Sequence, residues 1–162
     1  MEKSEMSIVA RHMATAPVNL EAIFTDLGID FQKEWMEEAS GSISRTGDKF
    51  TVCVNASESE NRQRFTAAHE LAHYLLHRDL MGDGKRMHRH VDNLYGAGDR
   101  SGNVIFKRAH EIEANRIAAQ IVMPRKLLKE KFADTRDAGA LATQFGVSKA
   151  AMEIRLKTLG LT

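Results

Sequence analysis

The first clear pattern of apolar and polar positions in the chain has the spacing of a helix. In the segment VNLEAIFTDLGIDF, the apolar side chains that recur at this spacing are Leu20, Ile23, Phe24 and Leu27. Gly28 follows them, and glycine is common directly after the last turn of a helix. The pattern therefore predicts an amphipathic helix that ends at Gly28.

A period of two replaces the helical spacing after residue 40. In the segment SGSISRTGDKFTVCVNA, the apolar positions that alternate with polar ones are Ile43, Phe50, Val52 and Val54. The alternation is interrupted by Thr46, Gly47 and Asp48, a composition typical of a tight turn. This pattern predicts a β-hairpin.

Helical patterns dominate the rest of the chain. We expect helices at 64–77, 106–122 and 126–132, and two further helices joined by a turn at Gly146. Pro124 ends the second of these, because the residue before a proline avoids the helical conformation. The interval 77–103 contains five of the chain's eleven glycines and no regular period, so we expect a long surface loop there.

Composition narrows the class of protein. The chain has 162 residues, of which 43% are hydrophobic and 28% charged, as in a globular domain with a real core. A net charge of +1 gives no general attraction to nucleic acid. The single cysteine, Cys53, cannot form an internal disulfide, which favours a reducing cytoplasm. We find no apolar run long enough for a membrane span and no secretory signal, so we expect no membrane partner.

The segment RFTAAHELAHYLLH contains the pattern H-E-x-x-H as His69, Glu70 and His73. Positions four apart lie on one face of a helix, so both histidines can reach one metal ion. Glu70 lies about 100° around the helix, where it can accept a proton from a polarised water as general base. The alternative is a chance match on an ordinary helix, expected in roughly one such chain in fifty.

Three further histidines lie near this motif. His77 continues the spacing of four, but three histidines along one helix span about 12 Å, too far for one tetrahedral ion. We therefore expect His77 to support the site or the structure without binding the metal. His88 and His90 lie in the predicted loop, either exposed to solvent or with one of them helping to hold the oxyanion of the reaction.

The third protein ligand is expected on the helix at 106–122, because catalytic zinc commonly has three protein ligands and a water. On a helical wheel, Glu111 lies among the residues of the apolar face, which are Ala114, Ile117, Ala118, Ile121 and Val122. Glu113 lies about 200° away, beside Arg116 and Gln120, on a polar face. A carboxylate on a buried face needs a strong partner, which a metal ion provides. Glu111 is therefore the predicted ligand.

Other side chains on this helix could support the metal site or offer an alternative to Glu111 as ligand. Asn115, one turn after Glu111, is placed to hydrogen-bond the free ring N–H of a histidine ligand. His110 on the apolar side competes as third ligand, although a carboxylate completes such a set more naturally. A structural salt bridge between Glu111 and Lys107 is the remaining alternative.

The segments RFTAAHELAHYLLH and EIEANRIAAQIVMP together resemble the ImmA/IrrE family of metallopeptidases. The resemblance covers roughly residues 43–124 and departs from the family pattern at Ile117, where the family usually has phenylalanine. It implies an α+β, zincin-like (gluzincin) fold with a small twisted sheet, an active-site helix and Glu111 as third ligand. On this basis we expect a metallopeptidase domain at 1–135 and a helix-turn-helix-like segment at 136–162 packed on it.

The resemblance also implies a function and a partner. We expect a cytoplasmic, zinc-dependent endopeptidase, with Mn²⁺ as the alternative metal. Its implied substrate is a helix-turn-helix (XRE-type) transcriptional repressor or an antitoxin. The strand near Thr51–Asn55 is expected at the sheet edge, where it can align an extended substrate. Cys53 on that strand is expected as a small buried side chain rather than a metal ligand.

Two alternatives to the endopeptidase remain open. The first is a regulatory protein that binds such a repressor or antitoxin with little cleavage. The second is a DNA-binding regulator that uses the C-terminal segment, in which Lys149, Arg155 and Lys157 would face DNA. Three positive charges without an aromatic or amide cluster are a weak footprint, so we favour a packing element there over direct DNA binding.

Overall fold

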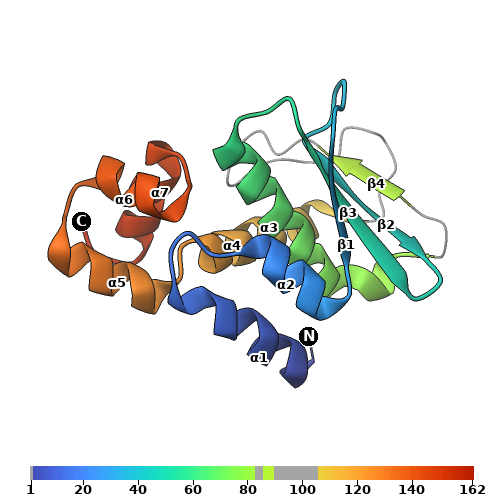
Figure 1. The fold of residues 1–162 in the computed structure, drawn as a ribbon, viewed down its shortest axis with the longest axis horizontal. Helices are drawn as coiled ribbons and strands as arrows, with labels where there is room; N and C mark the ends of the chain where they lie inside the picture. Colours follow the sequence, from blue (N-terminus) through green and yellow to red (C-terminus); the bar gives the residue numbers. More distant parts are fainter. Residues whose placement is uncertain (1, 83–85, 90–105) are drawn as a thin grey trace.

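The computed structural model describes residues 2–82, 86–89 and 106–162 (Figure 1). Within them, one four-stranded sheet lies at one end of the molecule, and helices α5–α7 gather at the other end. The helices are α1 Lys3–Arg11, α2 Leu20–Leu27, α3 Glu60–His77, α4 Arg108–Val122, α5 Arg125–Asp134, α6 Ala138–Phe145 and α7 Lys149–Thr158. The strands are β1 Asp30–Glu34, β2 Gly41–Thr46, β3 Lys49–Asn55 and β4 Arg86–Arg89. The α+β class is therefore confirmed.

The predicted hairpin is present as β2 and β3. Thr46 pairs with Lys49, so Gly47 and Asp48 form the turn, and Gly47 has a φ of 62°. The helix predicted before it is α2, which ends at Gly28 with a φ of 73°. Glycine reaches this left-handed conformation without the clash that a Cβ would cause.

The sheet order β1-β3-β2-β4 corrects the prediction that the strand at Thr51–Asn55 forms the sheet edge. β1 pairs with β3 in parallel, with Phe31 opposite Val52, and β2 covers the other side of β3. β1 escaped prediction because its sequence DFQKE has one apolar residue and lies mostly exposed. The described edges are therefore β1 and β4.

The interval 77–103 is not a continuous loop. A 3₁₀ turn at Arg78–Leu80 and strand β4 lie within its described part, and β4 pairs antiparallel with β2. The helices predicted at 64–77, 106–122 and 126–132 differ from the structure only at their ends. α3 begins four residues earlier than expected, α4 begins two residues later, and α5 extends one residue before and two beyond its predicted range. None of the helices in the described residues is long and apolar enough to cross a membrane.

Helix α3 packs on the sheet, and eleven of its eighteen residues are buried. Ile43, Val52 and Val54 of the sheet are fully buried in the shared core. A Cβ at Gly41 would overlap Cγ2 of Thr66 and would lie 2.9 Å from the carbonyl oxygen of Cys53. The close approach of β2 to α3 therefore requires glycine at this position, and it fixes the position of α3 relative to the sheet.

The C-terminal helices α6 and α7 form the predicted helix–turn–helix. Gly146 has a φ of 67°, and Ser148 caps α7 by accepting a hydrogen bond from the Ala151 amide at 3.1 Å. Arg155, one of the three cations that would face DNA, is 8% exposed, and its Nε donates to the carbonyl of Met123 at 3.1 Å. This side chain therefore joins α7 to the end of α4.

Candidate metal centre

Helix α3 presents the H-E-x-x-H residues to the interior. His69, Glu70 and His73 are all 0% exposed, and each offers a ligand atom that lies within 4.8 Å of the others. Ser59 begins the helix by accepting a hydrogen bond from the Arg62 amide at 3.3 Å. Eighteen residues then run without glycine or proline, so the spacing of four places both histidines on one face.

The two histidines approach each other through the same ring atom. Nε2 of His69 lies 3.1 Å from Nε2 of His73. Two nitrogens bound to one tetrahedral zinc ion lie about 3.3 Å apart, given zinc–nitrogen bonds of about 2.0–2.1 Å. Two neutral imidazoles and a carboxylate are also donors that zinc prefers. The residues present therefore fit a zinc ion.

The other ring nitrogen of His69 has a specific partner. Nδ1 of His69 lies 2.7 Å from Oδ1 of Asn115, and both side chains are buried. The hydrogen bond predicted between Asn115 and a histidine of the motif is therefore present. An amide oxygen only accepts, so Nδ1 carries the proton and Nε2 keeps its lone pair.

Two carboxylates lie near the pair of Nε2 atoms. Glu111 of α4 is 1% exposed, with Oε1 in contact with Nε2 of His73 and Oε2 3.7 Å from Nε2 of His69. Glu70 also satisfies the distance test for a metal group with both histidines. Glu111 faces both Nε2 atoms from the opposite helix, which is the position expected of a third ligand. Glu70 follows His69 directly and lies about 100° around α3.

A second chain of hydrogen bonds begins at His73. Nδ1 of His73 lies 2.9 Å from Nδ1 of His77, and Nε2 of His77 lies 2.6 Å from Oε1 of Glu113. Burial lowers the pKa of His77 from its ordinary value, against the opposing effect of the Glu113 hydrogen bond and charge. A neutral imidazole is thus favoured near pH 7, and it donates from one nitrogen and accepts at the other.

Glu113 was placed by the sequence on a polar face, and its side chain is indeed 42% exposed. Its carboxylate nevertheless reaches His77, which the helical wheel of a single helix cannot show. The available signal was the continued spacing of four on α3, which gives His77 the same face as His73. Because this face of α3 is buried, the ring nitrogens of His77 needed a hydrogen-bond partner from another helix, and Glu113 of α4 is that partner.

Phe106 is a neighbour of the site that no sequence pattern indicated. It is 2% exposed, and its ring stacks on His73 with centroids 4.1 Å apart and planes 5° apart. His110, the competing third ligand, instead accepts a hydrogen bond at Nδ1 from the Lys107 amide at 3.0 Å, and its ring lies 4.7 Å from that of His77. These rings pack beside the histidines of α3.

The oxyanion role considered for one of His88 and His90 is not tested by the described residues. The backbone of His88 pairs with Ser42 in the sheet. His90 lies outside the described residues. The oxyanion role of either residue stays a prediction.

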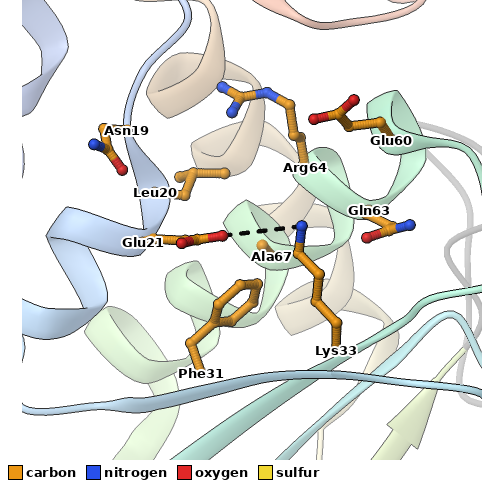
Figure 2. A pocket seen from close by; sticks show the side chains of 9 residues that line it. All are labelled: Asn19, Leu20, Glu21, Phe31, Lys33, Glu60, Gln63, Arg64 and Ala67. Carbon is orange, nitrogen blue, oxygen red and sulfur yellow. Dashed lines mark ion pairs between the residues drawn. The ribbon is translucent and has the colours of Figure 1, made fainter.

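A pocket of about 110 Å³ lies elsewhere, between α2, β1 and α3 (Figure 2). Figure 2 shows Lys33 and Glu21 facing each other across it, with Nζ 3.9 Å from Oε1. Its lining residues are Asn19, Leu20, Glu21, Phe31, Lys33, Glu60, Gln63, Arg64 and Ala67. None of the residues of the candidate metal centre lines it, so the pocket and the centre are separate features.

The fold and the site define a class of protein: an α+β protein with an H-E-x-x-H helix and a facing glutamate on a second helix. The family model described as IrrE N-terminal-like domain, Peptidase_M78, matches residues 24–157. The chain therefore belongs to this peptidase family, as the resemblance of its two motifs predicted.

One solved structure of similar fold is described as a Mycobacterium tuberculosis transcriptional regulator. The TM-score is 0.59 and the sequence identity 17%, over 97% of this chain and 47% of that one. At this identity the likeness shows a shared fold alone, and this chain spans about half the length of that protein. Among curated proteins, none matches the sequence.

Proposed function

We propose that the protein is a zinc-dependent endopeptidase with a zincin-like fold, in which His69, His73 and Glu111 hold the metal. The observation that carries this proposal is the convergence of three donors from two helices. The two Nε2 atoms lie 3.1 Å apart, and the carboxylate of Glu111 faces both. Membership of a peptidase family supports the same chemistry.

The side chains of this site have distinct tasks in the proposed reaction. Zinc, when bound, supplies Lewis-acid polarisation of a water molecule and of the scissile carbonyl. Glu70 accepts a proton from the attacking water and later donates it to the amine of the leaving peptide. Asn115 holds His69 in the tautomer whose Nε2 can bind a metal, through the hydrogen bond at 2.7 Å.

The proposed substrate is a protein, either a helix-turn-helix transcriptional repressor or an antitoxin. This substrate class is an expectation from the family. It fits a cytoplasmic enzyme that acts on intracellular regulators, with Mn²⁺ as the alternative metal. Direct contact with DNA is not part of the proposal.

A regulatory binding protein is the second candidate function. The likeness in fold to a protein described as a transcriptional regulator favours it. In this case the same metal-organised fold would hold a repressor or antitoxin without efficient cleavage. The retention of Glu70 beside His69 and His73 supports the enzyme over this alternative.

A Glu70→Gln variant separates the two candidates. We expect it to retain stoichiometric zinc, measured by elemental analysis, and to lose cleavage of a proteome-derived peptide library read by mass spectrometry. Zinc retention is expected because Glu70 is the proposed base and not a ligand. Equal cleavage by wild type and Glu70→Gln would exclude the proposed mechanism. Absence of cleavage by zinc-loaded wild type, with stable capture of a helix-turn-helix protein, would favour the binding protein.

A further inference from the structure

We propose that Glu113 and His77 select the ring tautomer of His73 in which Nε2 is free to bind a metal ion. The inference rests on the proposed metal site and adds two residues of this chain to it. Both are positioning residues, since neither is a ligand in the proposal. Sequence patterns had placed Glu113 on a polar face and given His77 only an unspecified supporting role.

The contacts form a continuous line from the protein surface to the candidate metal centre. Oε1 of Glu113, on the half-exposed side of α4, lies 2.6 Å from Nε2 of His77. Nδ1 of His77 lies 2.9 Å from Nδ1 of His73. Nε2 of His73 in turn lies 3.1 Å from Nε2 of His69. The rings of His77 and His73 are each contacted at both of their nitrogens, so the position of the proton on one ring sets its position on the next.

The direction of these hydrogen bonds follows from what each group can donate. A carboxylate only accepts, so Nε2 of His77 must carry the proton that it shares with Glu113. A neutral imidazole has one N–H, and Nδ1 of His77 is therefore an acceptor. The proton between the two rings then belongs to Nδ1 of His73. This leaves a lone pair on Nε2 of His73 for the metal ion, the form in which histidine binds metals. Without a metal, the carboxylate of Glu111 that contacts this nitrogen favours a proton there, so the link from Glu113 acts against that competing tautomer.

An amide in place of the carboxylate would not impose this direction. The side chain of glutamine can accept or donate, so His77 could carry its proton on either nitrogen. With the proton on Nδ1, His77 would donate to His73 and place the proton of His73 on Nε2. That tautomer cannot bind a metal. Glu113 therefore differs from a glutamine at this position, whose amide can turn either its oxygen or its N–H toward His77.

Packing holds the rings of His73 and His77 in place. Phe106 stacks on His73 at 4.1 Å, and the ring of His77 lies 5.8 Å from Phe106 and 4.7 Å from His110. Rings confined in this way keep their nitrogens aligned. The tautomer of each ring is therefore decided mainly by its hydrogen-bond partners. Among these side chains Glu113 is the most exposed, so its charge can be removed with the least disturbance to the core.

The test is a measurement of Zn²⁺ affinity in the full chain, by competition with a chromophoric chelator after removal of bound metal. The variants are Glu113→Gln and the matched control Glu130→Gln, which makes the same charge change on an exposed residue of α5. We expect Glu113→Gln to raise the Kd for Zn²⁺ about tenfold, within the range for outer partners of metal-binding histidines. Glu130→Gln is expected to bind as wild type does.

Two further readouts distinguish tautomer selection from a general structural role. The absorption bands of bound Co²⁺ are expected to shift in Glu113→Gln and not in the control, while the unfolding temperature of the metal-free protein stays the same. The double variant His77→Gln, Glu113→Gln is expected to bind Zn²⁺ no more weakly than His77→Gln alone, because both residues act in one chain.

The outcomes separate this inference from the proposed function. Wild-type protein that binds no Zn²⁺ would overturn the proposed metal site and this inference with it. Wild-type binding with an unchanged Kd and Co²⁺ spectrum in Glu113→Gln would overturn the inference alone. A tenfold loss in Glu113→Gln, with wild-type behaviour of Glu130→Gln, would support both.

Discussion

Oδ1 of Asn115 lies 2.7 Å from Nδ1 of His69, and this hydrogen bond joins α4 to the H-E-x-x-H helix in the buried interior. Two sets of hydrogen bonds reach the proposed metal-binding histidines, and this one consists of a single contact. The first is a neutral amide on His69, and the second is the chain through His77 to the carboxylate of Glu113.

An Asn115→Ala change is expected to weaken Zn²⁺ binding by about 10- to 100-fold, because His69 loses the acceptor that fixes its tautomer. Competition with a chromophoric chelator measures this change. Gln120→Ala, at an exposed position of the same helix, serves as the control and should bind as wild type does. Equal affinities of Asn115→Ala and Gln120→Ala would rule out the proposed role of Asn115.

Removal of Glu111 and removal of Glu113 are expected to have different consequences. Glu111→Ala should lose stoichiometric zinc, because one of three proposed protein ligands is removed. Glu113→Ala should still load fully at saturating Zn²⁺, because it loses only a positioning residue. Elemental analysis of both purified variants measures the difference. Full zinc in Glu111→Ala would show that another group, such as Glu70, completes the ligand set.

A Gly41→Ala change is expected to destabilise the protein by about 1–3 kcal/mol through overpacking between β2 and α3. The added Cβ would overlap Thr66 and approach the carbonyl of Cys53 at 2.9 Å. Urea unfolding of the metal-free protein measures the loss. Gly139→Ala on α6 is the control, since its Cβ would meet only the side chain of Asp137, at 3.6 Å. A Gly41→Ala variant as stable as this control would contradict the tight approach of β2 to α3.

An Arg155→Ala change is expected to lower the free energy of unfolding by about 1–3 kcal/mol, because the buried carbonyl of Met123 loses its donor. Lys157→Ala, on an exposed position of the same helix, should change it by less than about 0.5 kcal/mol. Chemical unfolding compares the two. Tight binding of duplex DNA by wild type, lost in the double variant, would instead support a DNA-binding role for α7.

The H-E-x-x-H helix and its contacts with α4 could be predicted in part from the sequence, for a physical reason. The spacing of four in α3 and the apolar face around Glu111 are periodic signals within single helices. They were sufficient to predict a hydrogen bond from Asn115 to a histidine of the motif, and the structure shows that this histidine is His69. The ligand set itself remains a proposal that the metal measurements above address.

The features that sequence reasoning missed depend on pairing between distant segments. Strand β1 is polar and mostly exposed, and only its pairing with β3 makes it a strand. The link between His77 and Glu113 likewise joins two helices and leaves no period on either one. The edge position assigned to Thr51–Asn55 failed because two neighbouring strands, one of them unpredicted, enclose it.

The proposed ligands come from α3 and α4, two helices that are far apart along the chain. A metal ion held between them would join the two helices in the folded protein only, so its binding free energy would add to the stability of the folded state. Loading with zinc would then make the two helices unfold as one cooperative unit. The free metal concentration would thereby set how long this part of the protein survives proteolysis.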